Sequence, residues 1–492
     1  MNKNIQVKIN QNTYRDKLYA CWIGKNIGGT MGGPYEGVKE ILDVQGFSTA
    51  AGVALPNDDL DLQLIWLHAV ETIGSRAVNA ASLGEFWLSL IPPHWNEYGL
   101  GKTNMELGLI PPLSGDYRNI WKHSNGAWIR TEVWASMAPA CPTLAAKYAI
   151  EDAKVDHGSG EGTYAAAFVA AMQSAAFVVS DLRRCIDLGL MAIPADCRIA
   201  DSIRLVIECY ESDKTAIEAR NLVFERNKDI GDGWFEAPSN VAYTVLGLVY
   251  GEGDFKRSMI LAINCGDDTD CTAATVGATL GILGGMDAIP EDWREHIGDE
   301  IITRSINQSD VGCQVPKSCT ELTERVMAQT PHLLFENDAP VALTDGETVL
   351  PEDLDGFLTA QCEKIADMSK VVPYSMHFDG LVFDADVALC GAPEIAPNGE
   401  LGVEITLTNN CPVFGRAFYN VIARWWLPEG FTVESDSQTL FLTRKDRRHD
   451  GKCHYSVKIR AGETVSATNR CVLELTIDGR SVPMYIPIVL IG

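Results

Sequence analysis

Two segments of the chain, residues 165–172 and 273–285, are apolar at nearly every position and rich in Ala and Gly. A helix that is apolar on all sides has to be buried on all sides. Its small side chains also let the backbones of neighbouring helices approach closely. Each segment follows directly on a polar loop. We therefore expect two central helices that hold these loops at their N-termini.

The spacing of apolar residues changes along the chain. From about residue 12 to 330 they recur at helical spacing. Past about residue 370 they alternate with polar residues, as in 403–408, and residues 473–477 run into a hairpin-turn signal, Asp478-Gly479. This change predicts an all-α domain followed by an immunoglobulin-like β-sandwich. The expected ranges are 1–330 for the all-α domain, 331–370 for a connector and 371–492 for the β-sandwich.

The composition excludes some partners. The formal net charge of −26 argues against nucleic acid or an anionic membrane surface, because either needs clustered Lys and Arg. The first residues lack the apolar stretch of a signal peptide, and no run reaches the roughly 18 apolar residues of a spanning helix. The 14 cysteines are scattered and form no CxxC pair, so we interpret them as buried thiols. We expect a soluble, cytoplasmic protein.

Two acidic clusters, at residues 57–61 and 267–271, each lie where a loop runs into an expected helix. One carboxylate would suffice to cap a helix. Three within four residues repel one another unless a cation or water relieves the repulsion. A magnesium ion takes about six oxygen ligands, and one segment seldom supplies them. The two clusters together therefore predict one metal site built from distant segments.

A glycine-rich segment at residues 24–36 is interpreted as part of a tightly packed helix and not as a dinucleotide-binding loop. Its glycines do not form a GxGxxG loop, and no strand precedes them. We expect a helix that packs tightly and ends at Pro34, which leaves Glu36 on a loop. A lone Glu in such a place is usually a solvated surface residue.

The loop at residues 156–162 contains three glycines and enters the helix at 165–172. Glycines allow close approach of a ligand, and the free N–H groups of a helix N-terminus suit phosphate or sugar hydroxyls. A capped turn without a ligand is the alternative interpretation. The segment 124–127, followed by Arg130, has a similar character. Aromatic residues at 95–98, 121 and 128 suit either sugar stacking or a core.

Taken in order, these segments resemble the ADP-ribosylglycohydrolase family over about residues 12–310. Pro34-Tyr35-Glu36 is similar to the family's opening motif, and Asn57-Asp58-Asp59 to its Thr-Asp-Asp metal motif. The segment 266–271 is similar to its Gly-Gly-Asp-Thr-Asp-Thr signature. The resemblance implies an all-α protein that binds two Mg²⁺ or Mn²⁺ ions and hydrolyses the glycosidic bond at C1″ of ADP-ribose.

The resemblance also assigns roles to residues. The implied metal ligands are Asn57, Asp58, Asp59, Asp268, Asp270 and Cys271. The implied catalytic carboxylates are Glu36 and Asp59. The implied substrate-binding residues are Ser124, Asn125, Gly126, Arg130, His157, Gly158, Ser159, Gly160 and Glu161. Asn57 and Cys271 stand where the family has Thr, and Asp267 replaces a Gly. A thiol is a poor Mg²⁺ ligand, so either one or two Mg²⁺ or Mn²⁺ ions are expected.

Three functions remain open on this basis. The leading one is metal-dependent hydrolysis that releases ADP-ribose from a modified acceptor, with Glu36 or a metal-bound Asp accepting a proton from water. The second keeps the fold but acts on a carbohydrate or nucleoside-like compound, which the β-sandwich and the aromatic residues favour. The third is a ligand-binding relative without activity, which Cys271 favours.

Overall fold

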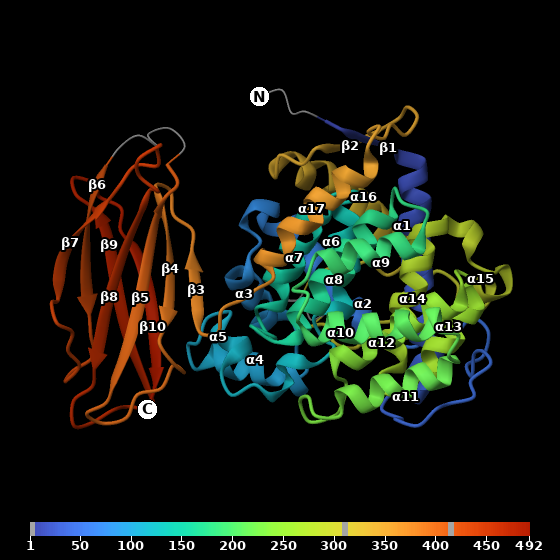
Figure 1. Cartoon of the computed structure of the whole chain (residues 1–492), viewed down its shortest axis with the longest axis horizontal. Coiled ribbons are helices and arrows are strands. Elements are labelled where there is room, and N and C mark those ends of the chain that lie inside the picture. Colours follow the sequence, from blue (N-terminus) through green and yellow to red (C-terminus); the bar gives the residue numbers. More distant parts are fainter. Residues whose placement is uncertain (1–4, 308–312, 412–417) are drawn as a thin grey trace. The chain divides into compact units, whose positions relative to one another are not determined.

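The computed structural model describes residues 5–307, 313–411 and 418–492. The chain divides into two compact units (Figure 1). The helical unit comprises residues up to Leu100 and residues 119–370, and the β unit comprises residues 101–118 and 371–492. The predicted fold class, an N-terminal all-α fold followed by a β-sandwich, is confirmed.

Many helices of moderate length make up most of the chain. The α-helices are α1 (Gln11–Gly32), α2 (Asp58–Ile73), α3 (Ala80–Leu90), α4 (Asn96–Glu106), α5 (Leu113–Asp116), α6 (Glu132–Met137), α7 (Pro142–Ala153), α8 (Glu161–Ala176), α9 (Leu182–Met191), α10 (Arg198–Glu211), α11 (Ala216–Asn227), α12 (Ala237–Gly251), α13 (Phe255–Asn264), α14 (Thr269–Gly284), α15 (Glu291–Ile297), α16 (Cys319–Glu336) and α17 (Leu354–Met368). The 3₁₀ helices are η1 (Gly33–Tyr35), η2 (Ser75–Ala77), η3 (Ile120–His123), η4 (Trp128–Arg130) and η5 (Gly285–Ala288).

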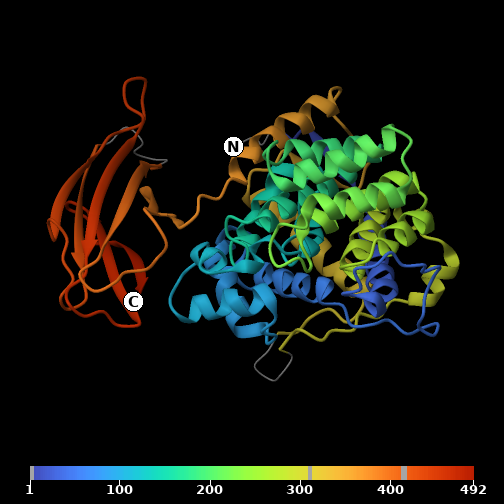
Figure 2. The ribbon, with the colours of Figure 1, turned by 60° about the horizontal axis from the view of Figure 1, so that its bottom comes forward.

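The two apolar segments form α8 and α14, and both are central, as expected. Every residue of α14 from Thr269 to Ile282 is buried, and α8 is buried nearly throughout. α14 packs against α1, α12 and α13, and α8 packs against α7 and α9. The long connection between α1 and α2, in blue in Figure 2, runs along the outside and is mostly exposed.

The backbones of α1 and α14 touch in an antiparallel arrangement. A Cβ atom on Gly24 would overlap the carbonyl of Gly277, and one on Gly32 would overlap the carbonyl of Thr269. Glycine is the residue that allows such close backbone contact. The contact brings the end of α1 beside the start of α14. η1 begins at Gly33 and contains Pro34, so the chain leaves the helix just before Glu36, as predicted.

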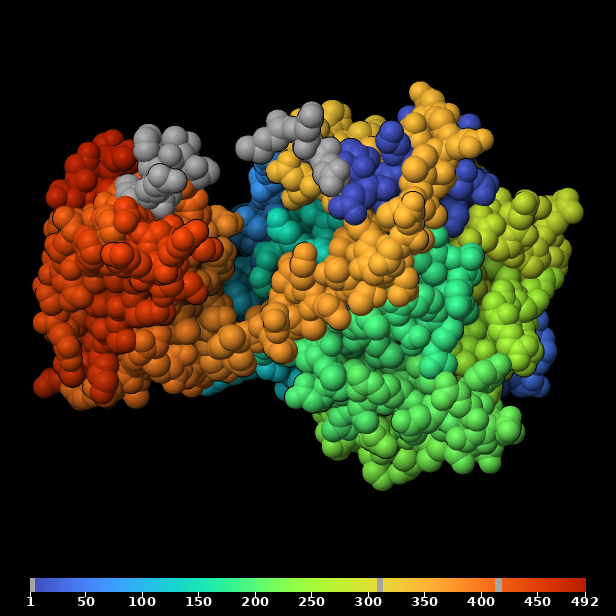
Figure 3. Space-filling model, turned by 45° about the horizontal axis from the view of Figure 1, so that its top comes forward, coloured from blue at the N-terminus to red at the C-terminus, as the bar shows by residue number. Residues whose placement is uncertain are grey.

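A small parallel pair of strands joins the chain's first described segment to a late one. β1 (Val7–Asn10) pairs with β2 (Val341–Thr344). In Figure 3 the blue N-terminal segment and the orange segment that contains β2 lie side by side on one face. Residues 331–370 therefore form the end of α16, β2 and α17 within the helical unit.

The β unit contains two four-stranded antiparallel sheets, with strand orders β10-β9-β6-β7 and β3-β4-β5-β8. Their strands are β3 (Ser375–Phe378), β4 (Phe383–Leu389), β5 (Glu400–Asn409), β6 (Tyr419–Trp426), β7 (Ser437–Leu442), β8 (Lys452–Arg460), β9 (Thr468–Ile477) and β10 (Met484–Ile491). Alternate side chains, such as Val403, Ile405 and Leu407, are buried in one shared core. The predicted period of two is therefore the alternation of buried and outward-facing residues.

The described residues contain no single helix that is long and apolar enough to cross a membrane. One pair, residues 269–288 with 291–297, passes the same test together and is bent by 113° at its break.

The contact between α1 and α14 predicts the effect of a single methyl group. Gly24→Ala should lower the free energy of unfolding by about 1–3 kcal/mol, because the added Cβ forces two packed backbones apart. Urea unfolding followed by circular dichroism measures this loss. Gly46→Ala is the matched control, since a Cβ there meets no atom within 4 Å. Equal stability of the two variants would contradict this account of the packing.

Candidate active site

Carboxylates from both acidic clusters meet where α1, α2 and α14 end or begin. One group consists of Glu36, Asp268 and Asp270, and a second consists of Asp59, Asp270 and Cys271. Within each group, one ligand atom per residue lies within 4.8 Å of the others. Asp270 belongs to both groups, so the predicted union of the two distant segments in one place is found in the structure.

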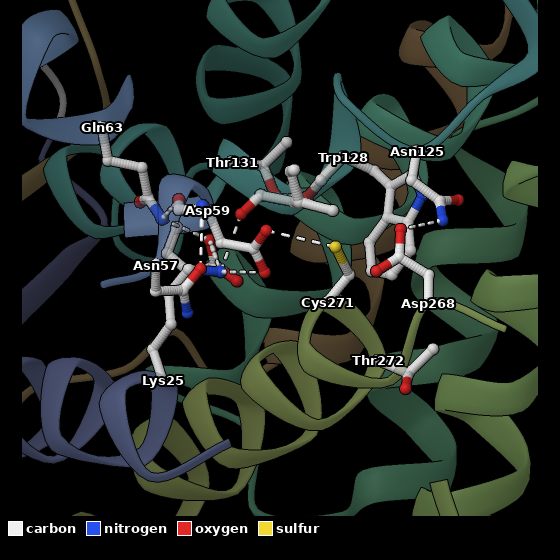
Figure 4. A network of polar contacts seen from close by, with 12 residues as sticks. Lys25, Asn57, Asp59, Gln63, Asn125, Trp128, Thr131, Asp268, Cys271 and Thr272 are labelled. Carbon is white, nitrogen blue, oxygen red and sulfur yellow. Dashed lines mark hydrogen bonds and ion pairs between the residues drawn. The ribbon is translucent and has the colours of Figure 1, made fainter. Parts of the chain in front are cut away.

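The first group contains buried oxygen atoms without a partner. Asp268 is 4% exposed and Asp270 is 6% exposed. The Oδ1 atom of each has no hydrogen-bond partner among the described residues. The Oδ2 atom of Asp268 accepts a hydrogen bond of 2.6 Å from Asn125 Nδ2 (Figure 4). Buried oxygens left unpaired are costly, and a bound cation is one way to satisfy them.

Crowding of the carboxylates changes their acidity. Burial raises the pKa of Asp268, and repulsion from Asp270 and Glu36 raises it further. Burial together with repulsion from Asp270 and Asp58 raises the pKa of Glu36 to about 7. Glu36 is the exposed member of its group, so it can exchange protons with water near neutral pH.

Asp58 and Asp61 hold an arginine at the rim of the site. Asp61 Oδ2 accepts hydrogen bonds from the backbone N–H groups of Arg304 (2.8 Å) and Ser305 (2.6 Å). Asp58 Oδ1 lies 3.2 Å from the Arg304 guanidinium, which also stands over the Trp95 ring at 5.2 Å. Burial raises the pKa of Asp61 to about 7. Arg304 was not identified from the sequence, since it lies outside both clusters.

Asp59 faces inward, where Lys25 and Cys271 are its neighbours (Figure 4). The Cys271 thiol donates to Asp59 Oδ1 at 3.2 Å, and Lys25 Nζ lies 4.0 Å from Asp59 Oδ2. Lys25 is fully buried, donates to the carbonyl of Ile129 at 2.7 Å and lies 3.1 Å from Glu132. Burial and the nearby carboxylates raise the pKa of Cys271 well above its usual range, so the thiol keeps its proton. The protein itself therefore supplies cationic and donor groups to Asp59.

Two residues from the clusters have structural roles here. Asn57 caps α2, because its Oδ1 accepts a hydrogen bond of 2.9 Å from the N–H of Asp59. Asp267 has a φ of 68° and turns away from the site, where Oδ2 accepts from Asn240 Nδ2 at 3.1 Å and Oδ1 from the N–H of Phe235 at 3.4 Å. Asp tolerates this left-handed conformation better than most residues do.

The two predicted substrate loops are joined by buried hydrogen bonds. Ser124 Oγ lies 3.2 Å from His157 Nε2, and His157 Nδ1 lies 2.8 Å from Asp156 Oδ1. Arg130 is fully buried and pairs with Asp152 at 2.9 Å and with Asp156 at 2.8 Å. Its guanidinium is occupied within the protein, so we assign Arg130 to positioning these loops.

The remaining predicted substrate residues are Gly158, Ser159, Gly160 and Glu161, at the start of α8. The Glu161 carboxylate accepts hydrogen bonds from the N–H groups of Arg198 (3.1 Å) and Ile199 (3.0 Å), which are at the start of α10. Gly160 packs directly against the backbone of Lys122. A Cβ atom on Gly160 would overlap the carbonyl oxygen of Lys122. These contacts fit the alternative interpretation of this loop as a capped turn.

A cavity of about 80 Å³ opens onto the first carboxylate group. It is lined by Glu36, Asp58, Trp95, Asn96, Glu97, Tyr98, Asn125, Gly126, Ile129, Phe235, Asp268, Asp270, Cys271 and Arg304. Glu97 and Lys25 were missed as functional residues. Lys25 is a charged residue within a helix that is otherwise uncharged from Leu18 to Gly32. That charge was the feature from which a buried functional lysine could have been predicted. Glu97 stands among aromatic residues, and no charge pattern marked it.

Known proteins show which family the chain belongs to. A family profile described as ADP-ribosylglycohydrolase matches residues 10–329. The chain therefore belongs to the ADP-ribosylglycohydrolase family, which is a family of hydrolases, and the resemblance predicted from the sequence is confirmed. A search of curated proteins found no match. One matching solved structure, titled "ADP-ribosylglycohydrolase-related protein complex", is 19% identical, with a TM-score of 0.39, and the match covers 65% of this chain and 98% of that chain.

The donor set decides how well a divalent cation fits. Glu36, Asp268 and Asp270 offer only carboxylate oxygens, which Mg²⁺ and Mn²⁺ prefer, and two of these oxygens are unpaired. The second group offers a protonated thiol, and an ammonium group lies near it. The first group fits a hard cation well, and the second fits it poorly.

Lys25 should be essential to stability because it balances buried charge. Lys25→Met should lower the free energy of unfolding by about 3–5 kcal/mol, since Glu132 then loses its buried cation. The double variant Lys25→Met/Glu132→Gln should recover part of that loss. Thermal and urea unfolding measure both, with the exposed Lys364→Met as control. A double variant as unstable as the single one would contradict the pairing.

The raised pKa of Glu36 predicts that cation binding releases protons. Below its pKa of about 7 the side chain is mostly protonated, so a cation has to displace a proton. Affinity for Mn²⁺ should therefore rise with pH through about 7 and level off about one unit higher. Calorimetry in two buffers of different ionisation enthalpy measures the protons released, and Glu36→Gln should release fewer. Equal release by both proteins would show that other groups titrate instead.

Proposed function

We propose that this protein is a divalent-cation-dependent hydrolase that cleaves the glycosidic bond of an ADP-ribosylated substrate and releases ADP-ribose. The observation that carries the proposal is the convergence of Glu36, Asp268 and Asp270 on one cavity, with buried oxygens that no group of the described protein satisfies. Membership of the ADP-ribosylglycohydrolase family supports the same reaction class.

The residues of the cavity have separate roles in the proposed reaction. Asp268 and Asp270 would hold Mg²⁺ or Mn²⁺, with Glu36 and Asp58 beside them. When bound, the cation supplies positive charge that orients the hydroxyls of the sugar. As the leaving group departs, C1 gains oxocarbenium character, which nearby carboxylates stabilise. Glu36, the exposed carboxylate of its group and part of the cavity lining, accepts the proton of the attacking water.

Asn125 has a supporting part in this arrangement. Its Nδ2 donates to Asp268, and its Oδ1 accepts a hydrogen bond of 3.0 Å from Trp128 Nε1. The amide is thus held at both ends, and it fixes which oxygen of Asp268 remains open. The predicted residues Ser124, Asn125 and Gly126 therefore act through the shape of the site and the orientation of its ligands.

A carbohydrate substrate is the second candidate function. Trp95, Tyr98 and Phe235 line the cavity, and Trp95 is 45% exposed. Aromatic faces of this kind suit stacking with sugars. Arg304 is the cation among the lining residues, and it is already paired with Asp58, which leaves little positive charge for a diphosphate. Incubation with ADP-ribosylated peptides and with aryl glycosides, each with Mg²⁺ or Mn²⁺, distinguishes the two.

The open carboxylate oxygens predict a specific loss of activity. Asp268→Asn should lower the rate of ADP-ribose release by about 100-fold or more, because it removes a charge from the cation and transition-state region. Release is measured by chromatography. Asp287→Asn is the control for loss of a carboxylate, since Asp287 is exposed and is not part of the cavity lining. Equal activity of Asp268→Asn and wild type would show that the site lies elsewhere, and binding without turnover by wild type would favour the inactive relative.

A further inference from the structure

Glu97, in the first turn of α4, has a buried carboxyl group whose role the preceding assignments leave open. The side chain is 6% exposed, and its Oε2 atom has no hydrogen-bond partner among the described residues. The residue lines the same cavity as Glu36 and Asp268. Glu97 therefore adds to the cavity wall a buried carboxyl group with one unpaired oxygen, and such an oxygen gains from a polar partner.

Glu97 is held firmly in this position. Any side chain on Gly126 would overlap Glu97 Oε1, so the carboxyl packs directly on the backbone of the loop that carries Asn125. Ser124 hydrogen-bonds to the Glu97 side chain. Behind Ser124, the chain of contacts continues through His157 to Asp156. Ser124 and His157 are thus positioning residues for Glu97.

The surroundings of Glu97 favour a protonated carboxyl group. Burial raises the pKa of Glu97 above its usual range; His157 and the hydrogen bond from Ser124 oppose this shift, and the negative charge of Asp156 adds to it. The cation of Arg130 is committed to Asp152 and Asp156. A raised pKa increases the share of Glu97 that carries a proton, and a protonated carboxyl group can donate that proton during a reaction.

We propose that Glu97 donates a proton to the leaving-group oxygen of the scissile glycosidic bond. The inference rests on the proposed function. The O–H bond of Glu97 breaks, the proton joins the leaving oxygen, and the electron pair of the C1–O bond moves to that oxygen. Water adds to C1 and gives its proton to Glu36, after which both carboxyl groups exchange protons with solvent. The acceptor is therefore attached through an oxygen and faces α4.

This role gives the cavity two carboxyl groups with different tasks, as glycoside hydrolysis requires. Glu36 lies with Asp268 and Asp270, whose unpaired oxygens would bind the proposed cation. Glu97 is held by a different loop, with Ser124 and His157 behind it. The acid and the base therefore come from elements that are far apart in the sequence.

The test compares two O-linked substrates that differ in their need for a proton. In an ADP-ribosylserine peptide the leaving alkoxide must be protonated, whereas 4-nitrophenyl ADP-riboside releases a stable phenolate. Glu97→Gln, in the full chain with Mn²⁺, should lower hydrolysis of the peptide by about 100-fold or more and that of the aryl compound by less than about 5-fold. Ser124→Ala should show a smaller difference in the same direction, and Ser124→Thr should restore it.

Glu85→Gln, on the exposed face of α3, is the control for loss of a carboxylate. Thermal unfolding and Mn²⁺ binding should be the same for Glu97→Gln and wild type. An equal loss on both substrates would make Glu97 a binding residue and overturn the proposal, as would full activity on the peptide. If wild type cleaves neither substrate, the proposed function fails as well, and this result is distinct from either of the others.

Discussion

The backbone contact between α1 and α14 is the constraint on which the site depends. Gly24 and Gly32 allow α1 to lie directly on the backbone of α14, in antiparallel orientation. The end of α1 thereby meets the start of α14, so Glu36 comes beside Asp268 and Asp270. The same small residues that make the interior close-packed also set the distance between the carboxylates. Packing and chemistry are therefore determined by one interface.

Carboxylates gathered in a buried place have to be neutralised, because isolated buried charges are expensive. The protein does this differently on the two sides of Asp270. On the inner side, Lys25 and the Cys271 thiol face Asp59. On the outer side, one oxygen each of Asp268 and Asp270 has no hydrogen-bond partner among the described residues, and both residues line the cavity. On the inner side the chain provides an ammonium and a thiol, although Asp59 Oδ2 has no hydrogen-bond partner among the described residues, and the all-carboxylate outer side suits a hard cation better.

The periodicity of apolar residues and the clustering of acidic ones were enough to predict the main features of the fold and the place of the site. These patterns placed α8 and α14 in the centre, the alternating strands in a β-sandwich, and the two acidic clusters in one site. The sequence could not decide that Asn57 caps its own helix, or that Glu161 accepts hydrogen bonds at the start of α10. Asn and Glu occur both in helix caps and in binding sites, and only the structure shows which groups they contact. Lys25 and Arg304 were missed since their partners lie far away in the chain, and only tertiary packing brings them together.

Some carboxylates of the two clusters bind other parts of the chain, which explains why each cluster contains more of them than the proposed cation would need. Asp61 binds the backbone at Arg304, and this places the guanidinium against Asp58 and Trp95. Asp267 binds the N–H of Phe235 and so fixes another wall of the cavity. One member of each cluster thus binds a residue of the cavity lining, while other members of the cluster line the cavity themselves. A cluster whose members include both structural residues and ligands contains more acidic residues than ligands. The spacing of the residues alone does not reveal which of them are ligands and which have structural contacts.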